Sequence, residues 1–182
     1  TSAQLAAGKM IVTYDQDASN HSYVYNLDGT MLHEIAFPTF GAVGFSCSYD
    51  EPEVFYSFTS FTFPTTIYTY DIEKNTSTVF RSPDVKFNPE DYITEQVFVT
   101  SKDGTQVPMF LTYKKGLVRD GKNPTLLYGY GGFNITLNPG FSTMRLPFLE
   151  KGGIYAQANL RGGNEYGEEW HIAGTKLQKQ NV

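Results

Sequence analysis

The stretch Leu126-Leu127-Tyr128-Gly129-Tyr130-Gly131-Gly132-Phe133-Asn134 joins an apolar run to a cluster of glycines. The leucines and tyrosines predict the end of a buried strand, and the glycines, which take positive φ freely, predict a sharp turn. Tyr130 stands at the lip of that turn, where its hydroxyl is a neutral hydrogen-bond donor at neutral pH. Such a donor on a fixed turn could stabilise a developing oxyanion. The alternative is a strand end whose tyrosine packs on a neighbour.

Composition narrows the class of protein. The chain has 182 residues, of which 40% are hydrophobic, 18% charged and 15% aromatic, typical of a globular, strand-rich protein. The net charge is −5 and no cluster of Lys and Arg stands out, so we expect no nucleic-acid partner. No apolar run reaches the ~20 residues of a membrane span, so we expect no membrane partner. Cys47 is the only cysteine, which excludes an internal disulfide.

The two ends of the chain lack the signals of a start and a stop. Thr1 to Gly8 contain neither a start methionine nor a basic region followed by an apolar core, so no signal peptide is visible. The last residues, Asn181-Val182, carry no stop signal. We therefore expect the sequence to be truncated at both ends, and we predict a cytoplasmic location, with the periplasm as the alternative.

The first half alternates short aromatic and β-branched runs with turn signals, as strands do. Strands are expected at 10–14, 22–27, 31–37, 54–58, 67–72 and 78–81, with a polar loop at 15–20. The run that starts at Tyr23 is matched by the run that starts at Tyr68, 45 residues later. That offset lies within the roughly 40–50 residues of a β-propeller blade. The alternative is an ordinary meandering β-domain with a chance match.

The second half changes character near Asn88-Pro89. A hairpin is predicted from strands at 95–100 and 107–113 around Asp103-Gly104. A strand at 125–128, a helix of about two turns after Ser142 or Thr143, and a strand at 154–160 then predict a parallel crossover and an α/β fold. Since ligands sit beyond the carboxyl ends of such strands, the glycine turn and the loop 161–167 are expected there together.

Several kinds of chemistry have no signature in the sequence. The glycine turn lacks the third glycine of a dinucleotide fingerprint and is followed by no GK[ST]. His21, His33, His171 and Cys47 show no metal-ligand spacing, and His171 is predicted to be a helix-surface or packing residue. Gly44-Phe45-Ser46-Cys47-Ser48 is only a near miss to the Gly-x-Ser-x-Gly elbow. No nucleophile with its base is visible.

Two glycine motifs carry a resemblance to a known family. They are Leu127–Asn134 and Ala158–Gly167, and further matching segments are Ser101–Thr105, Pro108–Phe110 and Val54–Phe61. In these segments the chain resembles the prolyl oligopeptidase (prolyl endopeptidase) family of serine peptidases. In that family a seven-bladed β-propeller caps an α/β-hydrolase domain and admits only short peptides. The resemblance implies that residues 1–85 are the last blades of the propeller and that residues 86–182 begin the α/β-hydrolase catalytic domain.

The resemblance also implies roles for individual residues. Tyr130 would be the oxyanion donor, together with a backbone N–H next to the catalytic serine. Phe133 would line the pocket for the substrate proline ring, where a flat apolar wall suits an apolar ring. The loop from Arg161 to Gly167 would be structural, with Arg161 either forming a salt bridge or acting in the site.

The family's serine, aspartate and histidine would lie beyond Val182, as would its proline-stacking tryptophan, so Trp170 is not given that role. The implied function is a serine-type prolyl endopeptidase that hydrolyses short peptides after proline through an acyl-enzyme, without cofactor or metal. Its partners would be short proline-containing peptides and the remainder of its own propeller and catalytic domain. The 182 residues alone are predicted to be inactive. The alternative function is a non-catalytic β-propeller interaction module with an α/β appendage.

Overall fold

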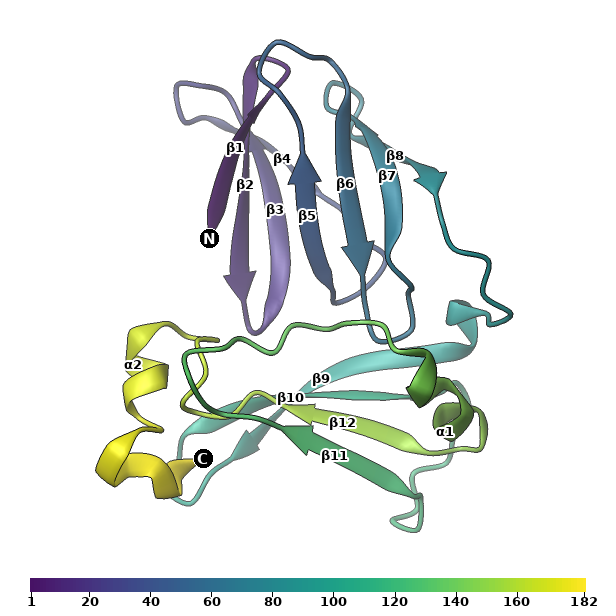
Figure 1. Ribbon diagram of the computed structural model, residues 1–182, viewed down its shortest axis with the longest axis vertical. Helices are drawn as coiled ribbons and strands as arrows, with labels where there is room; N and C mark the ends of the chain where they lie inside the picture. The colour runs from purple at the N-terminus through teal and green to yellow at the C-terminus, as the bar shows by residue number, and fades with distance from the viewer. The chain divides into compact units, whose positions relative to one another are not determined.

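A computed structural model describes all residues from 1 to 182. The chain divides into two compact units, residues 1–86 with 139–141 and residues 87–138 with 142–182. Twelve strands and two short α-helices make up the two units (Figure 1). None of the helices is both long and apolar enough to cross a membrane.

The first unit contains two antiparallel sheets of four strands, each in sequential order. The first sheet consists of β1 (Ser2–Ala6), β2 (Lys9–Gln16), β3 (Ser19–Tyr25) and β4 (Met31–Ile35). The second consists of β5 (Ala42–Ser46), β6 (Val54–Thr59), β7 (Thr66–Asp71) and β8 (Thr76–Arg81). Tyr23 in β3 and Tyr68 in β7 both lie on the third strand of their sheet, so the repeat seen in the sequence corresponds to one blade each.

One expectation about these strands was wrong, and two strands were missed. Residues 15–20 do not form a polar loop, because β2 continues to Gln16 and β3 begins at Ser19. The connection is the two-residue turn Asp17-Ala18, whose φ values of 49° and 61° match the left-handed pair of a tight hairpin. The strands β1 and β5 were not predicted, since their alanines, serines and glycine carry little strand signal.

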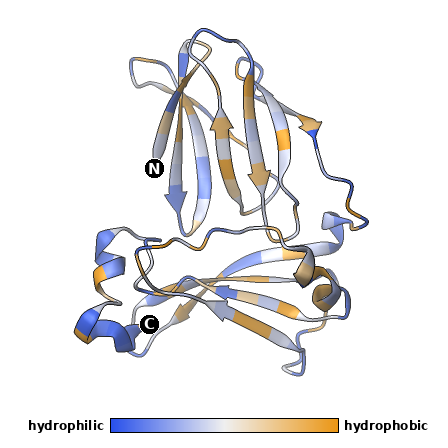
Figure 2. Cartoon of the chain, in the orientation of Figure 1, coloured by the Kyte–Doolittle hydropathy of each residue, from blue (hydrophilic) through white to orange (hydrophobic).

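The core of the first unit lies between its two sheets, because one face of each sheet is apolar. The nine core residues are Ala6, Ile11, Val24, Ile35, Val54, Tyr56, Phe58, Tyr70 and Ile72. Along β6 buried residues alternate with less buried ones, and Figure 2 shows the hydrophobic bands on this strand. A polar bridge joins the sheets as well: His33 Nε2 and Tyr70 Oη lie 2.9 Å apart, and the Tyr70 hydroxyl donates to Asn75. Each blade therefore depends on its neighbour to bury its apolar face.

A substitution at Phe58 tests whether the core between the two sheets stabilises the first unit. The Phe58 ring is 1% exposed and stacks on Phe37 with 5.6 Å between ring centroids. We expect Phe58→Ala to lower the free energy of unfolding by about 3–5 kcal/mol, through lost burial and the cavity left behind. Val79→Ala, on the exposed strand β8, is the control and should change it by less than ~0.5 kcal/mol. Equal effects in denaturant titrations would contradict the assignment of the core.

The second unit is built on one mixed sheet in the order β11-β12-β10-β9. The strands β9 (Tyr92–Thr100) and β10 (Gln106–Lys114) form the predicted hairpin, and β10 pairs antiparallel with β12 (Ile154–Ala158). The strand β11 (Thr125–Gly129) runs parallel to β12, which confirms the predicted crossover. The crossover contains a 3₁₀ turn, Thr143–Arg145, followed by α1 (Leu146–Glu150). A second helix, α2 (Glu168–Ile172), and a 3₁₀ segment, η3 (Lys176–Asn181), follow the sheet.

The prediction that β11 is a buried strand was wrong. All five of its residues are exposed, and Leu127 retains 66% of its accessible surface. Within residues 1–182, β11 has a strand neighbour on one side only, whereas β12 has a neighbour on both sides and is buried from Ile154 to Gln157. Ser142 does precede the helical segment as predicted, but its side chain forms no capping hydrogen bond.

Candidate active site

The turn that follows β11 has an unusual backbone. Gly131, Phe133 and Asn134 have φ values of 60°, 52° and 58°, all in the left-handed region. This conformation is uncommon outside glycine, and for a bulky residue such as phenylalanine it is an outlier. Strained backbone of this kind clusters at functional sites, so the observed outlier supports a functional role for the turn.

Tyr130 and Phe133 lie next to each other on this turn. Their ring centroids are 6.4 Å apart and the ring planes make an angle of 28°. Phe133 is 83% exposed and Tyr130 is 45% exposed. The Tyr130 ring therefore does pack on a neighbour, as expected if the turn were only a strand end. That packing nevertheless leaves much of the side chain accessible. No hydrogen bond within the chain engages its hydroxyl, which remains able to donate to a ligand.

The loop after β12 lies directly against this turn, as predicted from the shared carboxyl edge of the two parallel strands. The backbone N–H of Asn134 donates to the carbonyl of Gly162 over 3.1 Å. A Cβ atom on Gly131 would lie 2.8 Å from the Arg161 carbonyl oxygen, and one on Gly162 would lie 2.5 Å from the Gly131 oxygen. Any side chain at either position would clash with backbone, so the glycines are what allows the two loops to touch.

Buried polar side chains fix the irregular segment that leaves the turn. The N–H of Leu137 donates to Glu165 Oε1 over 3.1 Å, and the Leu137 carbonyl accepts from Gln157 Nε2 at 3.1 Å and Asn159 Nδ2 at 2.8 Å. Gln157, Asn159 and Glu165 are all at most 5% exposed. They supply the partners that a regular strand would otherwise give this backbone.

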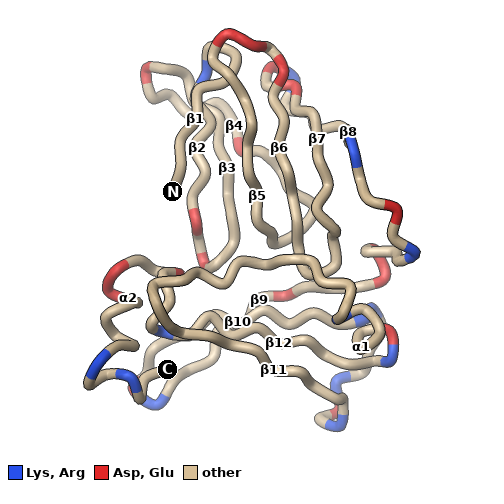
Figure 3. Tube along the Cα trace, viewed as in Figure 1, with Lys and Arg blue, Asp and Glu red and all other residues tan.

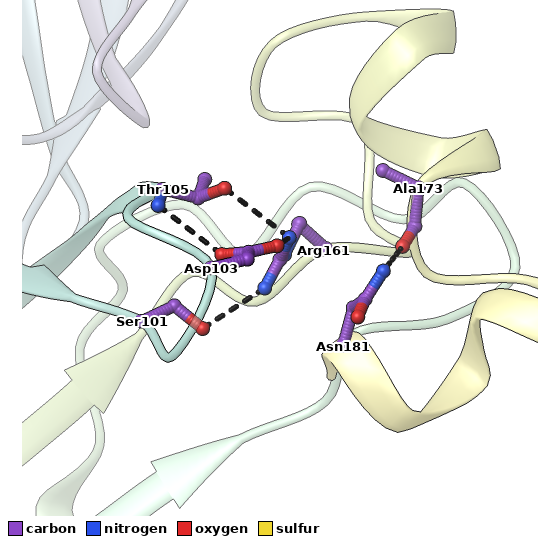
Figure 4. A network of polar contacts seen from close by, with 6 residues as sticks. All are labelled: Ser101, Asp103, Thr105, Arg161, Ala173 and Asn181. Carbon is purple, nitrogen blue, oxygen red and sulfur yellow. Dashed lines mark hydrogen bonds and ion pairs between the residues drawn. The ribbon is translucent and has the colours of Figure 1, made fainter.

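Arg161 forms an ion pair, one of the two alternatives left open by the sequence. Its guanidinium is buried and pairs with Asp103, and it also donates to Thr105 Oγ1 at 3.2 Å and to Ser101 Oγ at 2.9 Å (Figure 4). These three partners all lie in the turn between β9 and β10. Arg161 therefore ties that hairpin to the loop that supports the Tyr130 turn.

The hydrogen bond from Arg161, with smaller help from Thr105, lowers the pKa of Asp103 from 3.8 to about 2. A carboxyl whose pKa is lower in the folded state stabilises the fold above its unfolded pKa, and this contribution is lost as the pH falls through about 2. We expect Asp103→Asn to be less stable than the parent at neutral pH, and the difference to shrink towards pH 2. Urea midpoints across the acid range measure it, with the exposed Asp84→Asn as control. A difference that stays constant with pH would contradict the role of the ion pair.

Other polar residues considered from the sequence have structural partners. The Trp170 indole donates to the Leu160 carbonyl at 3.1 Å, and His171 Nδ1 donates to the Gly162 carbonyl at 2.8 Å. Both side chains thus hold the loop 160–162 from α2, and of the two structural roles predicted for His171, helix surface or packing, the structure favours packing. Gly44 to Ser46 run through the strand β5, so this near miss is not a nucleophile elbow. No group of three metal-ligating side chains converges within residues 1–182.

One residue at the turn was not predicted from the sequence. Lys179, in η3, places its ammonium 2.7 Å from the Gly131 carbonyl oxygen. Nothing in its local sequence, Lys176-Leu177-Gln178-Lys179-Gln180, distinguishes it from an ordinary surface lysine.

Comparison with known proteins agrees with this architecture. Residues 1–83 match the N-terminal β-propeller domain of prolyl oligopeptidase, and residues 139–182 match the prolyl oligopeptidase family. The chain is 51% identical over 96% of its length to a prolyl endopeptidase of Elizabethkingia meningoseptica, and 38% identical over 96% to prolyl oligopeptidase A of Amanita bisporigera. It spans about a quarter of the length of these relatives, 25% and 24%.

Solved structures give the same result. A structure from a study of two prolyl endopeptidases superposes with a TM-score of 0.89 and 45% identity, covering 100% of this chain and 27% of that one. Prolyl oligopeptidase B of Galerina marginata, bound to a 25mer macrocyclization substrate, superposes with a TM-score of 0.90 and 32% identity, covering 100% of this chain and 26% of that one. The fold is thus that of β-propeller blades followed by the start of an α/β-hydrolase domain. The chain belongs to the prolyl oligopeptidase family.

Proposed function

We propose that the protein containing this chain is a serine-type prolyl endopeptidase, which hydrolyses short peptides after proline through an acyl-enzyme. Family membership supports the reaction class. The observation that carries the proposal for this chain is the Tyr130 hydroxyl, accessible and without an internal partner, on a turn held by close backbone contacts. The solved Galerina enzyme was bound to 25mer and 35mer peptide substrates, which supports a peptide as ligand here.

The two units would contribute different parts of that enzyme. Residues 1–85 would be the last blades of the propeller, and residues 86–182 the beginning of the catalytic domain. The Ser-Asp-His triad would come from outside these 182 residues, so the chain alone would be inactive. Its partners would then be the remainder of the propeller and of the catalytic domain.

In the reaction, a serine oxygen would attack the carbonyl carbon of the proline residue, and the carbonyl oxygen would become an oxyanion. Tyr130 would donate its O–H to that oxyanion. Because the turn already holds the phenol in place, little reorganisation would be needed as the negative charge develops. The exposed ring of Phe133, beside Tyr130, would form an apolar wall against the proline ring.

Tyr130→Phe in the full-length protein tests the assignment. Removing one oxyanion donor costs about 3–4 kcal/mol of transition-state stabilisation, so kcat should fall roughly 10²–10³-fold while KM changes little. Tyr128→Phe is the matched control, since it removes the same hydroxyl group from a tyrosine that lies on β11 two residues earlier and is equally exposed, at 45%, within residues 1–182. An unchanged kcat in Tyr130→Phe would reject the catalytic role and favour the non-catalytic interaction module.

Phe133→Ala tests the pocket. Loss of the apolar wall removes burial worth about 1.5–3 kcal/mol, so kcat/KM for peptides cleaved after proline should fall roughly 10–100-fold. The fall should be much smaller for peptides with alanine in place of that proline, because a methyl group has little surface to bury against the ring. If both kinds of peptide lose activity equally, Phe133 does not contact the proline ring.

A further inference from the structure

In the turn that carries Tyr130, one backbone carbonyl is held by a side chain and not by the main chain. The Gly132 carbonyl accepts from the N–H of Ile135 at 3.1 Å, and the Asn134 N–H donates to Gly162. The Gly131 carbonyl instead accepts from a side chain, the ammonium of Lys179 at 2.7 Å. The distance is that of a strong, charge-assisted hydrogen bond.

This bond acts on the peptide unit between Gly131 and Gly132. Neither residue has a Cβ, so no side chain of its own fixes the orientation of this peptide plane, and the contacts that Gly131 makes have to fix it. Rotation of this plane would change the path of the chain between Tyr130 and Phe133, and with it the direction of the phenol. A hydrogen bond to the Gly131 oxygen selects one orientation of the plane.

Lys179 has no competing partner. It takes part in none of the seven ion pairs of the chain, and its one side-chain hydrogen bond is the one to Gly131. Basic residues are present in the segment that follows α2 (Figure 3). A second contact supports the same docking: a Cβ placed on Gly131 would lie 2.6 Å from Val182 Cγ1. The segment from Lys179 to Val182 therefore lies against the buried Gly131.

We propose that Lys179 is a positioning residue for the Tyr130 turn, holding the Gly131–Gly132 peptide so that the phenol is aimed at the oxyanion. The inference rests on the proposed function of Tyr130. Lys179 itself would not contact the substrate, and its effect on kcat would pass through the Tyr130 hydroxyl.

The test is a double-mutant cycle in the full-length protein, assayed with a short chromogenic peptide that has proline before the scissile bond. Lys179→Met keeps the apolar stem and removes the ammonium. We expect kcat to fall about tenfold, the loss of a modest charge-assisted hydrogen bond, with KM changed less than roughly twofold. Lys179→Arg, which can still donate to the carbonyl, should recover most of the loss.

Combination with Tyr130→Phe gives the discriminating measurement. If Lys179 acts through the phenol, Lys179→Met should change kcat less than roughly twofold once the hydroxyl is gone, so that the two effects are strongly non-additive. Lys176→Met is the control, because Lys176 is an exposed lysine of the same η3 segment without a bond to the turn. Its kcat should equal that of the parent. The thermal midpoints of all variants should be similar, since the substitutions are at exposed positions.

The outcomes separate the two proposals. A parent protein without peptidase activity, or an unchanged kcat in Tyr130→Phe, overturns the proposed function and the role of Lys179 with it. If kcat falls as expected in Tyr130→Phe but is unchanged in Lys179→Met, the role of Lys179 alone is overturned. Additive losses of kcat in the double variant overturn it as well. A lowered thermal midpoint with no recovery in Lys179→Arg overturns it too, because it shows a general structural role.

Discussion

The turn that carries Tyr130 depends on a close approach of backbone to backbone. Gly131, Gly162 and Gly174 meet where no Cβ atom has room, since one placed on Gly174 would lie 2.4 Å from the Gly162 nitrogen. Only this close approach allows the Asn134 N–H to reach the Gly162 carbonyl, and the Gly162 N–H to donate to the Trp170 carbonyl at 2.9 Å. The position of the phenol is thus set by main-chain contacts between three segments that lie far apart in the sequence.

The buried polar residues near the end of β12 follow from the same constraint. A segment without regular structure leaves its N–H and C=O groups unpaired unless side chains or water reach them. Gln157, Asn159 and Glu165 do this for Leu137, and Arg161 separately binds the β9–β10 hairpin. Polar side chains at these positions would be costly in an ordinary sheet core, where an unpaired polar group loses its hydration without compensation. Here they replace the missing strand partner.

The sequence predicted the features that have a local cause. Asp103-Gly104 identified its hairpin, the 45-residue offset identified the two blades, and the glycines identified the turn. It did not predict the exposure of β11, because an apolar strand has the same sequence pattern at an edge as in the centre of a sheet. Nor could it pair Lys179 with Gly131, 48 residues apart, since that contact depends on how α2 returns the chain to the sheet. Contacts set by tertiary docking leave no pattern in neighbouring residues.

Phe133 and Asn134 show how rigidity and strain are combined at the turn. A left-handed backbone costs of the order of 1–3 kcal/mol at a non-glycine residue, and less at asparagine, whose short polar side chain tolerates it. The contacts on both sides offset this cost, because the hydrogen bonds at Gly131 and from Asn134 to Gly162 hold the chain in the left-handed conformation. The consequence is that Phe133 projects outward beside Tyr130 instead of folding back onto the sheet. A pocket wall and an oxyanion donor held by one strained turn would be aligned before the substrate arrives, which is the condition for electrostatic preorganisation.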